Sequence, residues 1–242
     1  MDILVTMHFE GKIAIVTGGK GALGSVIARH FLDHGATVVI PYRKNAGRPS
    51  DVPSDLRNER THLIQADLAN NADAEAFVAE VAAKFGILDF LVNAAGGYAG
   101  GKTIDGVSFA EWEKVMEMNL TTTFLACRNV LRVMLPHNSG RIVNIAAMPA
   151  VMPGKEKGPY TVSKRGVITL TEVIAEEVKG KGITANAIAP SILLTEENRL
   201  SMPTADMRKW VTTEEVAQLV MFLCSDEARS ISGNVIKIFG GV

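Results

Sequence analysis

The chain has 242 residues, 47% of them hydrophobic, and a formal net charge of −1 at neutral pH. This length and composition are typical of an α/β protein with a substantial apolar core. The near-zero charge gives no electrostatic reason to expect a nucleic-acid partner or an anionic membrane surface.

The cysteines and the amino-terminal segment argue against a secreted, disulfide-bonded or metal-binding protein. Cys127 and Cys224 lie in apolar, helix-like runs, which favours buried free thiols over a disulfide or a metal site, so no metal is expected. Met1–Phe9 lacks the basic start and long apolar run of a secretion signal. No stretch reaches the ~18 apolar residues of a membrane span. We therefore expect a soluble, cytoplasmic protein that acts on a small-molecule substrate.

Short β-branched runs alternate with helix-like stretches, which is the pattern of a parallel sheet with helices on both faces. The expected strands are Ile13–Thr17, Thr37–Ile40, Leu63–Ala66, Asp89–Asn93, Arg141–Ala146, Thr184–Ile188 and Val235–Phe239. The expected helices are Ser25–His34, Asp73–Phe85, Phe109–Leu135, Pro159–Lys179 and Glu214–Ser225, and Lys44–Arg60 is expected to be a polar surface connection. The prediction is an α/β fold: one doubly wound, Rossmann-like domain over residues 1–242, with a seven-stranded parallel sheet.

A glycine-rich turn separates the first expected strand from the first helix. Gly19–Gly24 reads Gly-Lys-Gly-Ala-Leu-Gly, which fits the G-x-G-x-x-G pattern of dinucleotide-binding folds. Glycines let the backbone approach a diphosphate closely, and the following helix terminus offers free N–H groups to it. Glycine-rich turns are common, so a tight turn without a ligand remains the alternative at this point.

The end of the second expected strand bears on the choice of coenzyme. An NAD site usually has a carboxylate about 20 residues beyond the glycines, where it binds the adenosine ribose. Ile40–Lys44 contains no acid but has two adjacent cations, Arg43 and Lys44. Arginine binds a 2′-phosphate through paired, charge-assisted hydrogen bonds, so NADP(H) is favoured over NAD(H). The alternative is that both are ordinary solvated loop charges.

Tyr160 and Lys164 stand four residues apart, so on a helix both side chains leave the same face. A phenol beside an ammonium can serve as a proton donor. Lowering a tyrosine pKa from ~10 to ~7 requires about 4 kcal/mol. One ammonium at ~4 Å supplies about that much at an effective dielectric constant of ~20. We therefore expect Lys164 alone to suffice; a chance meeting on one helix face is the alternative.

Taken in order, these features resemble the short-chain dehydrogenase/reductase family over Glu10–Val242. The matching motifs are the glycine turn, Asp67-Leu68, Asn93-Ala94-Ala95-Gly96, Met118-Asn119-Leu120, the Tyr160/Lys164 pair, Asn186–Pro190 and Gly233 with Gly240-Gly241. The resemblance implies an NAD(P)H-dependent oxidoreductase.

The resemblance also implies roles for single residues. Tyr160 would be the acid/base, Lys164 would hold the nicotinamide ribose and lower the tyrosine pKa, and Asn119 would anchor a proton path through water. Ile192 and Thr195 would meet the nicotinamide carboxamide, and Asp67 would meet the adenine. The expected coenzyme-binding residues are Gly18, Lys20, Ala22, Leu23, Gly24, Arg43, Asp67, Leu68, Asn93, Ala94, Gly96, Tyr160, Lys164, Pro190, Ile192 and Thr195.

The chain departs from the family pattern at Ala147. Thirteen residues before Tyr160, the family usually has a serine that hydrogen-bonds the substrate carbonyl. Losing one such donor typically costs ~10²–10³ in turnover. Ser163 faces about 100° away from Lys164 on a helix, so we do not expect it to substitute. Two milder departures are Ala22, at the family's middle glycine, and Ser191, at the glycine after Pro190.

The alanine gives the chain a resemblance to the dihydropteridine reductase branch of the family, which has the Tyr/Lys pair without the serine. The similar stretches are Gly18–Gly24, Ala95–Gly101, Gly154–Lys164 and Thr195–Trp210. A quinonoid dihydropterin is already electrophilic, so hydride can add without a serine. The resemblance implies that Tyr98 is a platform for a flat heterocycle beside Ala147; an ordinary rim aromatic is the alternative. Arg43 differs, because that branch would carry an NADH-type acid there.

Other functions remain open. One is a carbonyl or 3-oxoacyl-thioester reductase that works without the serine. Another is a dinucleotide-binding sensor that does little chemistry, for which Ala147 is the best argument and Tyr160, Lys164 and Asn119 argue against it.

Two further expectations concern assembly and substrate access. The two longest expected helices carry apolar residues beyond one face, namely Phe124, Val130, Met134, Val167, Leu170 and Ile174. With the family resemblance, this implies a homo-oligomer, a dimer or a tetramer; packing under a lid is the alternative. Residues 190–212 are expected to form that substrate lid, with Thr195–Trp210 as a loop without clear structure.

Overall fold

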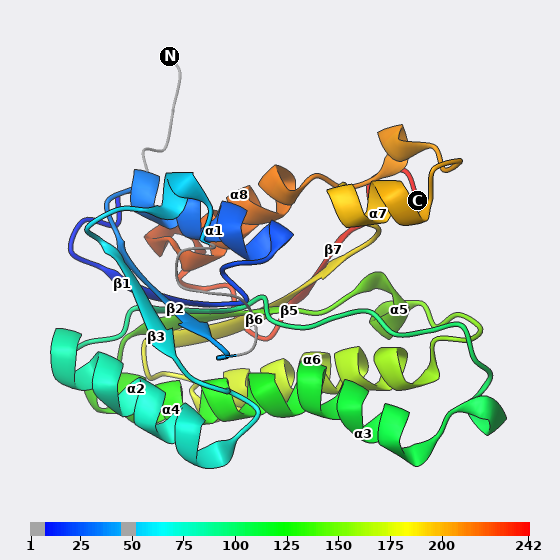
Figure 1. Ribbon diagram of the computed structural model, residues 1–242. Coiled ribbons are helices and arrows are strands. Elements are labelled where there is room, and N and C mark those ends of the chain that lie inside the picture. Colours follow the sequence, from blue (N-terminus) through cyan, green and yellow to red (C-terminus); the bar gives the residue numbers. More distant parts are fainter. Residues whose placement is uncertain (1–7, 45–51) are drawn as a thin grey trace.

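The computed structural model describes residues 8–44 and 52–242, and a parallel sheet forms its centre (Figure 1). The sheet has seven strands in the order β3-β2-β1-β4-β5-β6-β7. The strands are β1 (Ile13–Thr17), β2 (Thr37–Tyr42), β3 (Thr61–Gln65), β4 (Phe90–Asn93), β5 (Gly140–Ile145), β6 (Ile183–Pro190) and β7 (Val235–Ile238). All neighbouring strands run parallel. The order reverses between β1 and β4, and ligands of such sheets bind beyond the carboxyl ends of the strands at this reversal.

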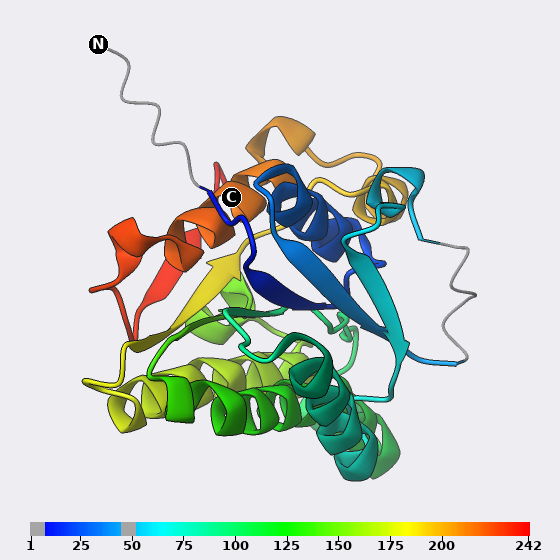
Figure 2. The same ribbon diagram turned by 90° about the vertical axis from the view of Figure 1, so that its left-hand side faces the viewer.

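Helices cover both faces of the sheet (Figure 2). On one face lie α1 (Ala22–Asp33) and α8 (Thr213–Cys224). On the other lie α2 (Asn71–Phe85), α3 (Phe109–Met116), α4 (Thr122–His137) and α6 (Gly158–Glu177). Two short helices, α5 (Met148–Val151) and α7 (Glu196–Ser201), lie at the end of the molecule where α6 begins (Figure 1).

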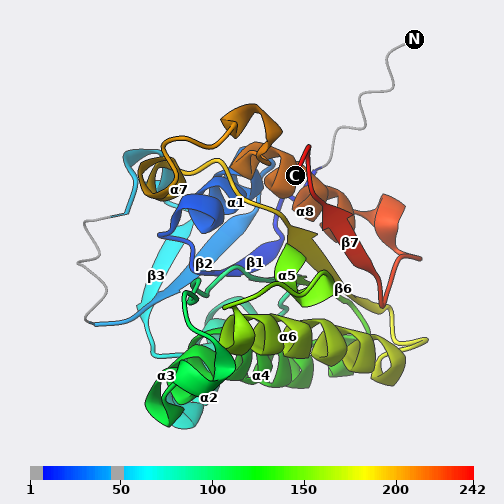
Figure 3. The ribbon, with the colours of Figure 1, turned by 90° about the vertical axis from the view of Figure 1, so that its right-hand side faces the viewer.

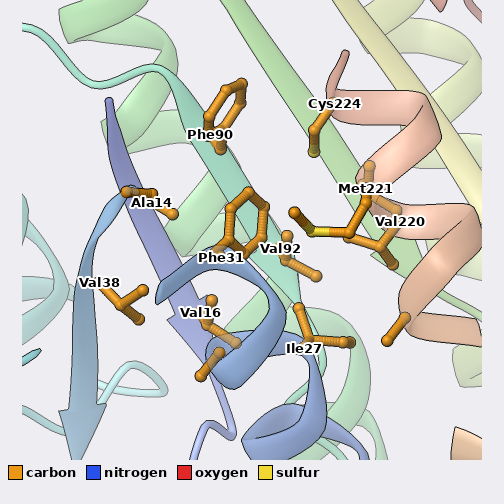
Figure 4. Close-up of a cluster of buried hydrophobic side chains, with 14 of the residues drawn as sticks. Ala14, Val16, Ile27, Phe31, Val38, Phe90, Val92, Val220, Met221 and Cys224 are labelled. Carbon is orange, nitrogen blue, oxygen red and sulfur yellow. The ribbon is translucent and has the colours of Figure 1, made fainter. Parts of the chain in front are cut away.

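Alternate residues of each central strand pack against opposite helical layers, because side chains alternate between the faces of a strand. Ala14, Val16, Phe90 and Val92 pack with α1 and α8 in one apolar cluster (Figure 4). Their neighbours Ile13, Ile15 and Leu91 join a second cluster with α2, α4 and α6. A sheet buried on both faces explains why the strands read as continuous apolar runs.

The predicted seven-stranded, doubly wound architecture is confirmed, but the helix predicted over Phe109–Leu135 is wrong in one respect. A π-helical turn, Glu117–Thr121, separates α3 from α4 and carries Asn119. Thr122 Oγ1 donates to the carbonyl of Glu117 (3.0 Å) and Thr123 Oγ1 to that of Asn119 (2.8 Å). Such local hydrogen bonds compete with the regular helical pattern, and π turns often occur at functional sites.

The expected lid also has more structure than predicted. It contains α7 and a short 3₁₀ helix, Met207–Lys209, in place of an irregular loop. Thr195 begins α7 as its N-cap, since its Oγ1 accepts from the Asn198 N–H at 3.2 Å. The missed signal was this cap followed by two acids in the first turn.

The remaining expectations concern the cysteines, the amino-terminal segment, the connection at Lys44–Arg60 and membrane-spanning helices. Cys127 and Cys224 are buried free thiols, as predicted. Part of the expected connection, 45–51, and residues 1–7 of the amino-terminal segment lie outside the described residues; 52–60 includes a 3₁₀ turn, Ser54–Leu56. Within the described parts of the chain, no helix is both long and apolar enough to cross a membrane.

The apolar residues from which we predicted an oligomer are mostly core residues. Val130, Met134, Val167 and Ile174 are fully or almost fully buried within the chain, so they are not available to a second subunit. Phe124 is exposed. The physical reason is that α4 and α6 pack on the sheet with wide faces, which the sequence pattern cannot distinguish from an outer face.

Candidate active site

The glycine turn between β1 and α1 is shaped by close backbone approach. Gly18 has a positive φ of 68°, and a Cβ there would lie 2.8 Å from the Ala95 nitrogen. A Cβ on Gly24 would collide with the Gly18 carbonyl oxygen. Ala22, in place of a glycine, is simply the first residue of α1. Gly21 precedes it without a side-chain cap, so the first-turn N–H groups of α1 have no such partner and can bind an anion.

Cations gather at the end of β2, next to this turn. Lys20 Nζ lies over the Tyr42 ring, 5.8 Å from its centroid. Arg43 and Lys44 follow directly and are exposed, and within the described residues neither forms an ion pair. The contact between Lys20 and Tyr42 was not apparent from the sequence.

Asp67 and Leu68 lie just beyond the carboxyl end of the neighbouring strand β3. The Leu68 side chain is buried, whereas Asp67 is part-exposed and its Oδ1 accepts from the Ala69 N–H at 3.1 Å. Because parallel strands end at one edge of the sheet, both residues share the edge of the glycine turn.

A row of buried polar side chains crosses the sheet at the same edge. Strand register pairs Thr17 with Asn93, and Asn93 with Asn144. Asn93 Nδ2 donates to Asn144 Oδ1 (2.8 Å), and Asn144 Nδ2 donates to Thr171 Oγ1 on α6 (2.9 Å). We call Thr17, Asn93, Asn144 and Thr171 the polar row.

One of the expected coenzyme-binding residues, Asn93, lies inside this row. The Asn93 side chain is only 2% exposed, and its amide is engaged inside the row. Thr17, at the other end of the row, supports the turn after β4, since its Oγ1 accepts from the Ala95 N–H at 3.1 Å. Sequence reasoning missed Asn144 and Thr171, although strand alternation puts Asn144 on the α6 face.

The turn after β4 joins three elements. Asn119, fully buried on the π turn, accepts from the Gly97 N–H (3.0 Å) and donates to the Gly97 carbonyl (3.1 Å). A Cβ on Gly96 would lie 2.5 Å from Asn119 Oδ1 and 3.1 Å from Lys164 Nζ. Only glycine fits between these two polar groups, so Gly96, Asn119 and Lys164 form one packed unit; Ala94 lies just before it.

Lys164 and Tyr160 lie near the start of α6. Lys164 is buried, its Nζ donates to the Ile145 carbonyl (2.8 Å), and burial lowers its pKa to about 8. Burial raises the pKa of Tyr160 to about 12, and Tyr98 makes a smaller contribution in the same direction. The Tyr98 ring meets the Tyr160 ring edge-on, with centroids 5.2 Å apart.

The expectation that Lys164 alone brings the Tyr160 pKa to neutrality is therefore wrong for this structure. Burial disfavours the phenolate and the ammonium alike, and the ammonium is engaged with the Ile145 carbonyl. The sequence estimate assumed a charged lysine and ignored desolvation.

No hydroxyl stands where the family's serine would be. Ala147 is buried and extended, with φ −164° and ψ 157°, just before α5. The Ser163 hydroxyl is fully buried and donates to the Tyr160 carbonyl within α6 (2.8 Å). As expected, Ser163 does not fill the position.

Backbone hydrogen bonds join the two ends of the segment that follows β6. Pro190 ends β6 and is buried. The Val211 N–H donates to the Ile192 carbonyl (3.0 Å), and the Leu194 N–H donates to the Val211 carbonyl (2.7 Å). Residues 195–210 therefore leave and return at one point, and Figure 3 shows their helix α7 at the same end of the molecule as α5.

Comparisons with known proteins agree with this geometry. Residues 12–205 match the family model described as short chain dehydrogenase. The chain is 33% identical to the D-threitol dehydrogenase of Mycolicibacterium smegmatis over 97% of its own length and 94% of that protein. It is 30% identical to the 3-oxoacyl-(acyl-carrier-protein) reductase of Vibrio cholerae over 98% and 99% of the two chains.

A solved structure is similar throughout. A short-chain type dehydrogenase/reductase from Mycobacterium ulcerans aligns with a TM-score of 0.88 at 25% identity, covering 97% of this chain and 90% of that one. With a glycine turn, a Tyr/Lys pair and a doubly wound sheet in common with this family, the chain belongs to the short-chain dehydrogenases/reductases and is an NAD(P)-dependent oxidoreductase.

Proposed function

We propose that this protein uses NADPH to reduce an electron-poor substrate, with Tyr160 as the proton donor. The observation that carries the proposal is the packed unit of Gly96, Asn119 and Lys164 beside Tyr160, at the sheet edge that also holds the glycine turn. Such an arrangement would bring a proton donor to the reactive ring of a dinucleotide bound at this edge of the sheet.

The residues of the glycine turn fit a dinucleotide diphosphate. Gly18 and Gly24 leave space that any side chain would fill, and the start of α1 offers its N–H groups. When bound, the coenzyme supplies the hydride. The residues that would hold it are Gly18, Lys20, Ala22, Leu23 and Gly24 at the diphosphate, Asp67 and Leu68 at the adenine, and Asn93, Ala94, Gly96, Pro190, Ile192 and Thr195 toward the nicotinamide.

The preference for NADP(H) over NAD(H) rests on the cations after β2. Arg43 is exposed, and Lys20 is held over Tyr42 immediately before it. A 2′-phosphate between these two side chains would accept charge-assisted hydrogen bonds from both.

Three side chains of this site would share the handling of protons. Tyr160 is protonated at neutral pH because its pKa is raised to about 12, and that is the form in which a reduction consumes it. Lys164 would hold the coenzyme ribose, and a positive charge on the oxidised nicotinamide would favour the phenolate that remains. Asn119 fixes the turn at Gly97 and would anchor the proton path to solvent.

The substrate that we favour is a quinonoid dihydropterin or a similar flat, electron-poor ring. Ala147 offers no hydroxyl to polarise a carbonyl, and such a ring does not require one. Tyr98 is 64% exposed beside Tyr160 and would be a platform for the ring.

A carbonyl or 3-oxoacyl-thioester reductase is the second candidate. The specific observation in its favour is the similarity to the Vibrio cholerae 3-oxoacyl reductase over almost the whole chain. A dinucleotide-binding sensor that does little chemistry remains the outcome to be expected if Tyr160 proves dispensable.

Steady-state oxidation of NADPH tests the function. Quinonoid dihydropterin and an acetoacetyl thioester serve as the two probes, with Tyr160→Phe as the variant. We expect turnover of the dihydropterin, and a loss of ~10²–10⁴-fold in Tyr160→Phe because its proton donor is gone. Turnover of the thioester alone would end the pterin proposal. NADPH binding without turnover of either probe would favour the sensor.

Binding titrations test the coenzyme preference. Arg43→Ala should weaken NADPH binding roughly 10–100-fold and leave NADH binding nearly unchanged, because one charge-assisted contact to the 2′-phosphate is lost. Arg229→Ala, at an exposed arginine directly after the 3₁₀ turn Asp226–Ala228, is the control and should change neither affinity. Equal losses for both coenzymes would contradict the assignment.

We also propose a homo-oligomer and a lid. The exposed residues Phe124 on α4 and Val162 and Val173 on α6 offer apolar surface for a second copy. Light scattering should give the mass of a dimer or tetramer, and a monomer would contradict this proposal. Residues 190–212 would close over the substrate, and α7 would be the part that moves because the base is tied by backbone hydrogen bonds.

A further inference from the structure

Tyr98 lies in the glycine-rich segment after β4 and has a free hydroxyl. Its side chain is 64% exposed, and its ring meets the Tyr160 ring at an interplanar angle of 72°. No hydrogen bond of the Tyr98 hydroxyl is found within the described part of the chain. This phenol is therefore available to donate to a ligand beside Tyr160.

The backbone around Tyr98 is shaped to hold this hydroxyl in place. A Cβ on Gly100 would collide with Tyr98 Oη, so this hydroxyl lies close over the Gly100 backbone. The Gly101 N–H donates to the Glu156 carbonyl (2.8 Å), and Lys102 pairs with Lys157 as an isolated bridge. Glu156 has a left-handed φ of 59°, a strained conformation for a residue other than glycine. These contacts fix the Tyr98 segment to the stretch that leads into α6 and Tyr160.

Two other observations show that neither Ala147 nor Ser163 supplies a hydroxyl to a ligand here. Ala147 has no hydroxyl, and the Ser163 hydroxyl is used inside α6. The two phenol rings are also in contact, with centroids 5.2 Å apart, and Tyr98 contributes to the raised pKa of Tyr160.

We propose that the Tyr98 hydroxyl donates a hydrogen bond to the substrate heteroatom that receives the proton of Tyr160, and so performs the task of the absent hydroxyl at Ala147. This inference rests on the proposed reductase function. Hydride adds to the electrophilic atom of the substrate, and the electron pair of the broken π bond moves to the heteroatom. The Tyr160 O–H bond breaks and its proton forms the new bond to that heteroatom. Tyr98 keeps its proton and stabilises the negative charge while it develops.

Kinetics of three variants test the proposal with NADPH and whichever probe the unsubstituted protein reduces. Tyr98→Phe keeps the aromatic ring and removes the hydroxyl, so kcat should fall on the order of 10²-fold while KM changes little. Adding Ala147→Ser to Tyr98→Phe should restore at least about a tenth of the lost activity. Ala147→Ser alone should raise kcat by a smaller factor than the same change does in Tyr98→Phe, because a donor is already present. Activity of Tyr98→Phe equal to that of the unsubstituted protein, or no rescue by the serine, would overturn the inference but not the reductase function.

A second measurement needs no substrate. The chain has three tyrosines, so protein labelled with 3-fluorotyrosine should give fluorine NMR signals that single Tyr→Phe variants can assign. The Tyr160 pKa should fall in Tyr98→Phe, because a neighbouring phenol no longer opposes its ionisation. An unchanged Tyr160 pKa would mean that the hydroxyls are too far apart to act on one atom, and would overturn the inference. If neither probe is reduced, the reductase proposal fails, and this titration alone decides whether the two hydroxyls are paired.

Discussion

The two faces of the sheet are built differently. On the α1/α8 face, Phe31 stacks near Phe90 (centroids 5.3 Å apart), and the Phe9 ring meets Phe90 edge-on at 4.8 Å. On the α2/α4/α6 face, the core contains the polar row and the buried ammonium of Lys164. The α1/α8 face is stabilised by apolar burial. In the core of the α2/α4/α6 face, some of the buried groups are polar and must be hydrogen-bonded.

The polar row determines the position of α6 on the sheet and also contributes to stability. The hydrogen bonds between its members link each strand to the next, and the last one holds Thr171 of α6 against β5. A buried amide accepts few alternative arrangements, because an unpaired partner would cost about 1–3 kcal/mol. The helix that carries Tyr160 and Lys164 is thereby held in one register on the sheet. An apolar contact alone would permit small shifts.

The largest expected effect comes from removing a buried apolar side chain from the α1/α8 face of the sheet. Phe31 is fully buried, and Phe31→Ala should lower the free energy of unfolding by about 3–5 kcal/mol through lost burial and a cavity. Denaturant unfolding measures it, and turnover per folded molecule should stay the same because α1 keeps its glycine turn. Phe109→Ala, at a side chain that is 73% exposed, is the control and should cost less than about 0.5 kcal/mol. Equal losses of unfolding free energy for the two variants would contradict the claim that apolar burial stabilises the α1/α8 face.

The next effect concerns Lys164 and depends on pH. Its pKa falls from 10.5 to about 8 on burial, so between these values the unfolded chain binds more protons and stability from this group rises with pH. Below pH 8 the penalty for a buried ammonium is fully present, on the order of 3 kcal/mol.

Lys164→Met removes this penalty. Without added coenzyme, the free energy of unfolding of the variant relative to the unsubstituted protein should be highest below pH 8 and should decline as the pH rises to 10.5. Lys114→Met, at an exposed lysine of α3, should show no such slope. A difference that stays constant over this range would mean that the Lys164 pKa is not lowered.

The smallest effect comes from the end of the polar row. Thr171→Val keeps the side-chain volume but leaves Asn144 Nδ2 without its acceptor, which should cost about 1–2 kcal/mol of unfolding free energy. Thr169→Val is matched in helix propensity and lies exposed on the same helix, so it should be nearly neutral. If both variants behave alike in denaturant unfolding, the row does not restrain α6.

Much of the fold was predictable because its signals are local. β-branched runs, glycine turns and helical periodicity gave the strand and helix order, and seven strands were found near the predicted positions. The π turn was not predictable, because it accompanies local hydrogen bonds of Thr122 and Thr123 that the apolar pattern does not report. Helix α5, with four residues, is too short to show a period.

The sequence predicted many residues of the candidate site, but it did not predict how they are arranged in space. Gly18, Gly24, Tyr160 and Lys164 were found through spacing, because each motif is contained within one turn or helix face. Asn144 and Thr171 were missed because their partners are distant in the sequence, and the link between them depends on strand register.

The sequence by itself determined the doubly wound sheet, the glycine turn after the first strand and the shared helix face of Tyr160 and Lys164, since all depend on local periodicity and spacing. Only the tertiary structure decided how charged and polar groups behave. Burial raises the pKa of Tyr160 and lowers that of Lys164. Register joins Asn93 to Asn144, and the pairing of two distant segments brings Tyr98 to Tyr160. Desolvation and long-range contacts depend on what surrounds a group, and no stretch of sequence contains that information.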